Sequence, residues 1–161
     1  MVGKGHRIYS TQTVRVSRTI DAPLRYVYDW CTDYRSDDWR LSPRGARRRF
    51  RVLRLSPHRL LRIRLTPNGS EDPDVAVDVL RLEPPRAWHT DQVDEDDRET
   101  VDYRLTRLGP HRTRLDLLVT ERYVVPHPPT SAETRGRLLA VWARYGAEIE
   151  ARYRNGRPAL G

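Results

Sequence analysis

Apolar and polar residues alternate with a period of two through most of the chain, which is the pattern of half-buried strands. In the first such segment, residues 13–20, Val14, Val16 and Ile20 share one face. From Ala46 the same period continues through six more segments, up to about Val125. Turn sequences separate these segments at Ser56-Pro57, residues 67–73, Glu83-Pro84-Pro85, residues 94–97 and Gly109-Pro110. Short turns favour consecutive antiparallel pairing.

Two stretches near the first strand have helical character instead. A helix is predicted from Leu24 to about Thr32, because Asp21 can cap it and Pro23 fits its first turn. A second short helical piece is predicted from Tyr34 to Arg40 and ends before Ser42-Pro43.

The longest predicted helix closes the chain. Thr130 or Ser131 can cap it, with Glu133 or Thr134 in its first turn. Apolar residues then recur at helical spacing up to about Tyr153, at Leu138, Val141, Trp142, Tyr145 and Ile149. This apolar face must be buried, and the concave side of the sheet is the large partner available to it.

The opening sequence resembles a known superfamily. Residues 14–23 (VRVSRTIDAP), followed by Val27 to Asp33, are similar to the START-like or SRPBCC group, which includes polyketide cyclases, lipid-transfer domains and the birch-pollen-allergen group. In that group a similar stretch runs from the first strand into the first helix, with Asp-Ala-Pro at the junction. The resemblance covers roughly Gln12 to Tyr153.

The resemblance implies an α+β helix-grip fold. A curved antiparallel sheet of about seven strands, in the order β-α-α-β6-α, would surround the long C-terminal helix and enclose a pocket. Residues 1–12 would form a flexible N-terminal arm, residues 13–154 a START-like ligand-binding domain, and residues 155–161 a C-terminal tail. Such pockets are mostly apolar, with a few polar groups that orient the ligand.

Composition indicates where in the cell the protein is expected. No apolar run approaches the ~20 residues that cross a bilayer, and Met1 to Ser10 lacks the apolar core of a signal peptide. Cys31 is the only cysteine, which excludes an internal disulfide and agrees with a reducing compartment. We therefore expect a cytoplasmic protein, monomeric or homodimeric.

Aromatic residues are the main candidates for lining the pocket. The predicted ligand-binding residues are Trp30, Trp88, Tyr103, Leu117, Val119, Glu121, Leu138, Trp142 and Tyr145. The alternative is that the aromatic side chains only fill the core, since aromatics contribute much of core burial.

Glu121 and His89 are weak catalytic candidates. If Leu115, Leu117 and Val119 face inward, strict alternation places Glu121 on the same face, where it could orient a ligand or act as an acid or base. Alternatively, Glu121 lies solvated near the rim. The five histidines are scattered without metal-ligand spacing, so neither a metal nor a cofactor is expected.

The formal net charge is +8, and Lys4 is the only lysine among 30 basic residues. Arg47, Arg49 and Arg51, with Arg62 and Arg64 on the next strand, could form a basic patch on the convex face. Such a patch could bind phosphates of nucleic acid or of anionic lipids. Pairing with acids such as Asp78 or Asp102 could neutralise it instead.

Three functions remain open from the sequence. The first is a binding or carrier protein for an apolar or amphipathic small molecule, lipid-like or aromatic. The second is a polyketide cyclase or dehydratase-like enzyme that acts in the same cavity. The third is an arginine-rich module that binds nucleic acid or an anionic membrane surface.

Overall fold

The computed structural model describes residues 10–34, 49–66, 74–93, 97–124 and 127–160. In these ranges the chain forms a seven-stranded antiparallel sheet in the order β1-β7-β6-β5-β4-β3-β2, with two helices. The elements are β1 (Ser10–Ile20), α1 (Leu24–Thr32), β2 (Arg49–Ser56), β3 (Arg59–Thr66), β4 (Asp74–Glu83), β5 (Ala87–Val93), β6 (Arg98–Gly109), β7 (Arg112–Tyr123) and α2 (Ser131–Arg154).

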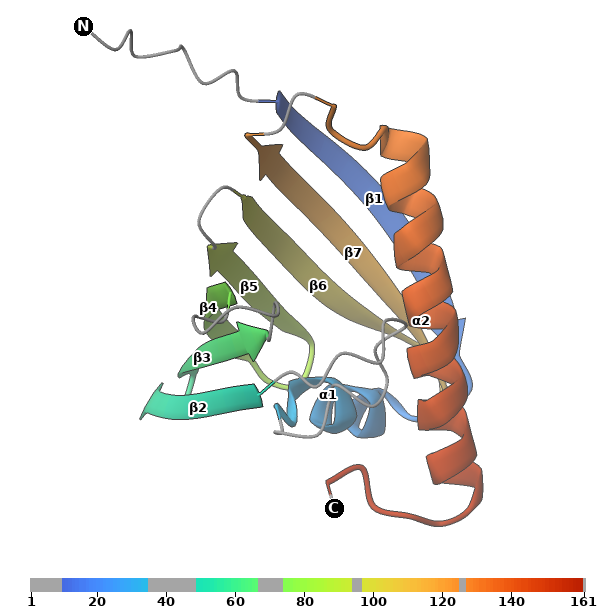
Figure 1. Ribbon diagram of the computed structural model, residues 1–161. Helices are drawn as coiled ribbons and strands as arrows, with labels where there is room; N and C mark the ends of the chain where they lie inside the picture. Colours follow the sequence, from blue (N-terminus) through green and yellow to red (C-terminus); the bar gives the residue numbers. More distant parts are fainter. Residues whose placement is uncertain (1–9, 35–48, 67–73, 94–96, 125–126, 161) are drawn as a thin grey trace, which may run out of the picture.

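The architecture confirms the predicted helix-grip fold. The sheet curves, and α2 runs the length of one of its sides next to β1, while α1 closes one end (Figure 1). β1 begins at Ser10, so residues 10–12 extend the strand that we predicted to begin at residue 13. Apart from Tyr34, the second short helical piece lies outside the described residues.

The ends of α2 follow from local sequence. Thr130 accepts a hydrogen bond from the Glu133 backbone N–H at 3.2 Å, and Glu133 accepts one from the Thr130 backbone N–H at 2.7 Å. This reciprocal capping box confirms the predicted N-terminus. Helix α1 starts differently: Pro23 is its N-cap, and no side chain caps it. The prediction that Asp21 caps α1 is therefore wrong.

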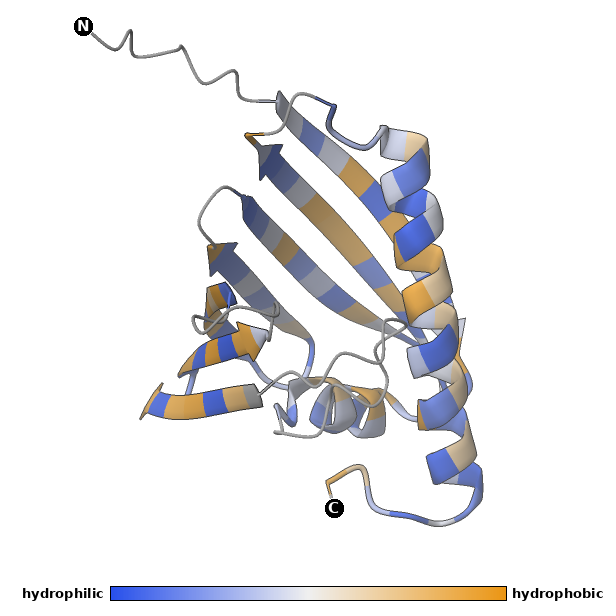
Figure 2. Ribbon diagram, in the orientation of Figure 1, coloured by the Kyte–Doolittle hydropathy of each residue, from blue (hydrophilic) through white to orange (hydrophobic). Residues whose placement is uncertain are grey.

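The core lies between the inner face of the sheet and the two helices. Its buried strand residues alternate along β1, β6 and β7, as the period of two predicts. Figure 2 shows alternating hydropathy along β1 and β6 and a continuous apolar stretch in the middle of β7. The members are Val14, Val16, Ile20, Val101, Leu105, Leu115, Leu117 and Val119 from these strands, with Ala22, Val27, Tyr28, Trp88, Trp142 and Ile149.

Strands β3 and β4 turn the opposite way from our expectation. Arg62 lies directly opposite Asp78, which is only 1% exposed, and the two form an ion pair at 2.5 Å on the inner face. Arg64 shares that face by alternation. The predicted basic patch on the convex face is therefore wrong for Arg62 and Arg64, and the alternative pairing with Asp78 is confirmed.

The consequence is an apolar outer face on one half of the sheet. Since Arg62 and Arg64 take inner positions of β3, Leu61, Ile63 and Leu65 take the outer ones, and their register partners on β4 are aliphatic too. On the flanking strands Leu53 and Val93 continue the aliphatic surface, whereas Arg49, Arg51 and Asp91 lie opposite Leu65, Ile63 and Val79. We call this the outer aliphatic patch: Leu53, Leu61, Ile63, Leu65, Val75, Val77, Val79 and Val93.

The other half of the outer face is polar. There, side chains pair across strands, as a solvated sheet face requires. These pairs are Ser17 with Asp116, Thr13 with Thr120, His89 with Asp102, and Asp91 with Arg98. The same face of one sheet thus changes character between β5 and β4.

Two glycines of α2 provide a matched test of how the helix meets β1. A Cβ at Gly146 would overlap the Arg18 guanidinium, whereas a Cβ at Gly136 would meet no atom within 4 Å. Gly136→Ala should raise the free energy of unfolding by about 0.5–1 kcal/mol through helix propensity. Gly146→Ala should stabilise less than Gly136→Ala, because Arg18 must move. Urea denaturation measures both, and equal stabilisation by the two variants would contradict the close helix–strand contact.

Candidate functional site

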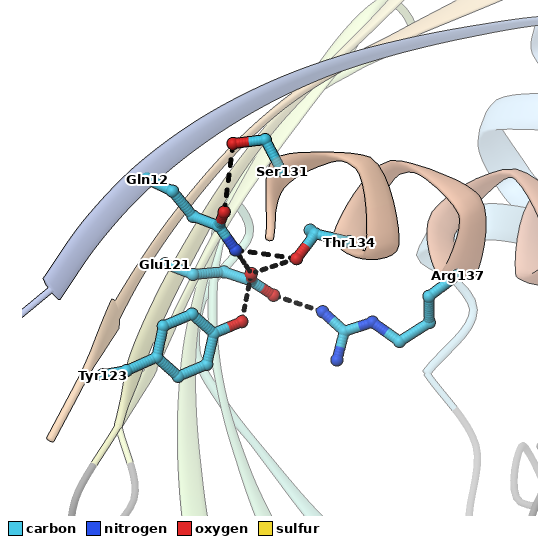
Figure 3. A network of polar contacts seen from close by, with 6 residues as sticks. All are labelled: Gln12, Glu121, Tyr123, Ser131, Thr134 and Arg137. Carbon is cyan, nitrogen blue, oxygen red and sulfur yellow. Dashed lines mark hydrogen bonds and ion pairs between the residues drawn. The ribbon is translucent and has the colours of Figure 1, made fainter. Parts of the chain in front are cut away.

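Glu121 is the centre of a polar network at one end of the inner face (Figure 3). It is 3% exposed, and its Oε2 accepts hydrogen bonds from Gln12 at 3.0 Å, from Thr134 at 3.2 Å and from Tyr123. Arg137 forms an ion pair with Oε1. The network joins β1, β7 and the first turns of α2. The inward orientation of Glu121 predicted from alternation is thus confirmed.

Glu99 adds a second carboxyl group to this network. It lies directly opposite Glu121 in the register of β6 and β7. Burial, together with the hydrogen bond and charge of Glu121, raises the pKa of Glu99 to about 7. Burial opposes ionisation of Glu121 as well, but hydrogen bonds from Tyr123, Glu99 and Gln12, with the charge of Arg137, lower its pKa. Glu99 therefore gains or loses its proton near neutral pH, whereas Glu121 is ionised there.

A second polar group lies across the sheet, on β3 and β4. The Arg62 guanidinium, paired with Asp78, stands 4.8 Å from the centre of the Tyr34 ring and 5.2 Å from that of Phe50. Such contacts stabilise a cation over aromatic faces. Asp78 Oδ1 is buried and has no hydrogen-bond partner among the described residues.

Aromatic rings connect the inner face to both helices. Trp88 and Tyr103 stack at 4.4 Å, Tyr103 contacts Trp142 at 5.9 Å, and Trp142 contacts Tyr145 at 5.3 Å. The series continues to Trp30 on α1 and, from Trp88, to Tyr28. We call Tyr28, Trp88, Tyr103, Trp142, Tyr145 and Trp30 the aromatic series.

Tyr103 is the link between the aromatic series and the polar groups. Burial raises its pKa, with further contributions from Tyr34 and Glu99, while a hydrogen bond with Thr90 and the charge of Arg62 oppose the rise. Its phenol is therefore neutral at physiological pH and can donate or accept a hydrogen bond. Glu99 from one polar group and Arg62 from the other thus both influence the pKa of Tyr103.

The structure brings most of the predicted ligand-binding residues together. All five aromatic candidates belong to the series, Leu117 and Val119 lie beside them in the core, and Leu138 packs against that core. His89 does not join them: it lies on the outer face, 2.7 Å from Asp102. Whether the gathered residues bind a ligand stays a prediction.

Several residues of the site were missed by sequence reasoning. Glu99 could have been found, because it shares a strand face with Val101 and Tyr103. Tyr123 could have been found as well, because it follows Glu121 by two residues and so shares its strand face. Gln12, Thr134 and Arg137 become neighbours of Glu121 only through strand register and the position of α2. No periodic pattern in the sequence signals that meeting.

The described residues contain neither a cluster of metal ligands nor a membrane-spanning helix. No group of three or more His, Cys, Asp or Glu side chains gathers there as a metal site would require. None of the described helices has the length and apolar character to cross a membrane.

Comparison with known proteins identifies the fold. No protein-family model and no curated protein matches the sequence. Among solved structures, the Zhui aromatase/cyclase from Streptomyces sp. R1128 is 18% identical, with a TM-score of 0.63 over 89% of this chain and 96% of that one. A START superfamily protein from Mycobacterium smegmatis is 14% identical, with a TM-score of 0.66 over 86% and 97%. Ara h 8.0201 is 7% identical, with a TM-score of 0.66 over 88% and 99%. The START-like resemblance is thus confirmed at the level of the fold.

The raised pKa of Glu99 predicts how stability depends on pH. Between about pH 4.5 and 7 the folded state holds a proton that an ordinary unfolded glutamate releases, so the free energy of unfolding should fall as pH rises through this window. The shift corresponds to a loss of about 3 kcal/mol. Glu99→Gln, uncharged in both states, should abolish most of this loss in urea denaturation at both ends of the window.

Glu83→Gln is the control, because Glu83 is an exposed carboxylate of the same sheet. It should retain the wild-type pH dependence. The window lies above the range in which Glu121 titrates, since the pKa of Glu121 is lowered. An unchanged slope in Glu99→Gln would mean that Glu99 is ionised at neutral pH.

Proposed function

We propose that this protein binds an apolar or amphipathic small molecule between the inner face of the sheet and α2, and acts as its carrier. The observation that carries the proposal is the aromatic series, which runs over the inner face and both helices between two buried polar groups. Apolar walls with few polar groups are typical of small-molecule sites.

Buried polar atoms support an amphipathic ligand over a purely aliphatic one. A buried acceptor without a donor costs about 1–3 kcal/mol, so native proteins rarely keep one without a use. Asp78 Oδ1 is such an acceptor, and the hydroxyl of Tyr28 also lacks a partner among the described residues. A ligand hydroxyl could donate to Asp78 while its apolar body contacts the aromatic rings.

Aromatic character in the ligand is favoured by the geometry of the series. Trp142 meets Tyr103 and Tyr145 at interplanar angles of 60° and 88°, so the aromatic series is itself built from tilted and edge-to-face ring contacts. Offset-stacked and edge-to-face contacts with a flat ligand are both favourable. The names of two neighbours, a START superfamily protein and an aromatase/cyclase, agree with a small-molecule site in this fold.

The binding proposal predicts a saturable site that depends on Trp142. We expect the fluorescent dye 8-anilinonaphthalene-1-sulfonate to bind with one main affinity, and Trp142→Leu to weaken it at least about ten-fold through lost apolar contact. Leu139→Ala is the matched control, because Leu139 is 45% exposed on the same helix. Fluorescence titration measures both, and native mass spectrometry of the purified protein should reveal a copurified ligand.

Two results would contradict this proposal. One is the absence of both a copurified ligand and a saturable dye site. The other is dye binding that Trp142→Leu leaves intact while circular dichroism shows the variant to be folded. Loss of dye binding on substitution within the outer aliphatic patch, with no effect of Trp142→Leu, would place the dye on the outer face.

A cyclase or dehydratase-like activity is the second candidate, and the raised pKa of Glu99 is the observation that favours it. A group with a pKa of about 7 can both give and accept protons at neutral pH, as acid–base catalysis requires. Glu121 suits this role less well than the sequence suggested, because several donors and Arg137 already stabilise its ionised form. In an aldol-type cyclisation, the Glu99 carboxylate would take a proton from a methylene carbon between two carbonyls. The resulting carboxylic acid would then return that proton to the ketone oxygen as the carbanion carbon bonds to the carbonyl carbon.

The enzymatic candidate predicts a specific pH–rate profile. With a linear poly-β-ketone thioester as substrate, cyclisation should depend on a group that titrates at about pH 7, and Glu99→Gln should lower kcat by about 10²–10⁴-fold. Product analysis by liquid chromatography and mass spectrometry measures the rate. His89→Gln, on the outer face, is the control and should leave the rate unchanged. Equal rates in Glu99→Gln and wild type would exclude this role for Glu99.

A further inference from the structure

The outer aliphatic patch has no counterpart layer among the described residues. Helices α1 and α2 lie against β1, β6 and β7, on the inner side of the sheet. Leu53, Val75 and Val93 are about half exposed, at 52%, 49% and 49%. The largest contiguous apolar patch on a protein surface, typically a few hundred Å² in area, is often functional.

Register shows that the patch is continuous. Leu53, Leu61 and Val79 form one row across β2, β3 and β4, and the next row places Ile63 beside Val77 and Val93. A third row adds Leu65 and Val75. The rows are adjacent, so eight aliphatic side chains form one flat surface.

The size of the patch argues against a second copy of this chain as the partner. Three to four strands about 4.8 Å apart and about six residues long give a flat footprint on the order of 300 Å². A stable protein interface buries about 800 Å² on each partner. Binding to a bilayer requires no such minimum area, because the binding strength grows with the apolar area that enters the bilayer and with electrostatic attraction.

The charged residues at the edge of the outer aliphatic patch also favour a bilayer over a second copy of the chain. Arg59 and Arg81 lie opposite each other in the row next to Leu61 and Val79, and Arg51 lies beside Ile63. All three are exposed on the outer face. Asp91 lies opposite Val79 and near enough to Arg81 for that charge to help lower the pKa of its carboxyl, but Asp91 itself is ion-paired with Arg98. Two copies packed patch to patch would bring these positive charges together, whereas anionic headgroups would neutralise them.

We propose that the outer aliphatic patch and its three marginal arginines dock this protein on an anionic lipid bilayer. The aliphatic side chains enter the boundary between headgroups and acyl chains, and Arg51, Arg59 and Arg81 contact the headgroup phosphates and carboxylates. This surface is on the opposite face of the sheet from the aromatic series, so the proposal does not depend on the identity, or the existence, of an inner ligand.

Vesicle co-sedimentation tests the proposal with the full chain. Vesicles of phosphatidylcholine and phosphatidylserine in equal parts should bind the protein, and vesicles of phosphatidylcholine alone should bind it much more weakly. Ile63→Thr with Val77→Thr should reduce binding at least about ten-fold, because the apolar contact is lost while threonine keeps the strand propensity. Leu118→Thr is the matched control, an aliphatic residue of the outer face on β7, and should bind like wild type.

The arginine contribution is tested separately with surface variants that carry little risk to folding. Arg51→Gln, Arg59→Gln and Arg81→Gln should each weaken binding about five-fold at low salt and flatten its salt dependence. Arg15→Gln, exposed on the outer face of β1, is the control.

Three outcomes would overturn the proposal. The first is no binding to the anionic vesicles. The second is binding that the Ile63 and Val77 substitutions leave unchanged. The third is a wild-type dimer in analytical ultracentrifugation that these substitutions dissociate, which would assign the patch to a second copy.

Discussion

The buried ion pair between Arg62 and Asp78 decides which face of β3 and β4 is turned inward. In a sheet, side chains alternate strictly between faces, so one fixed pair determines the position of every other residue on those strands. Arg62 is held by the Asp78 carboxylate at 2.5 Å and by the nearby rings of Tyr34 and Phe50. The inner polar group and the outer aliphatic patch are therefore two results of one constraint.

A second polar group holds the other end of the inner face. Glu121 connects Gln12 on β1 and Thr134 on α2 through one carboxylate, and so fixes the start of the long helix against the sheet. Its lone pairs are occupied by several donors, which suits a structural role. Glu99, with the higher pKa, is left as the group that can exchange a proton near neutrality. Between these polar ends stands the aromatic series.

Alternation in a sequence shows which residues share a face, but not which face is buried. This explains both the successes and the error of the sequence analysis. The bounds Leu24–Thr32 of α1, the capping box of α2 and the inward Glu121 depend on local signals, and all were predicted. The sequence also shows that Leu61, Arg62 and Ile63 alternate, but this alternation fits a strand with either face turned inward. Asp78 and the buried Ala76 and Leu80 on the neighbouring strand decide between them, and register is not visible in a single strand.

Aliphatic residues are divided between the two faces of β3 and β4. Leu60 and Leu80 are buried on the inner face, at 2% and 0% exposed, while Leu61, Ile63 and Leu65 lie on the outer one. A register slip of one residue would exchange the two sets and expose the arginines. Full burial of each aliphatic side chain is worth about 1.5–3 kcal/mol, while a buried ion pair often contributes little net stability. Burial of Leu60 and Leu80 therefore supports the observed orientation together with the ion pair, and the outer aliphatic residues are left for a further contact. An amphipathic ligand satisfying Asp78 inside and a lipid surface covering the aliphatic residues outside would both favour the orientation that the ion pair sets.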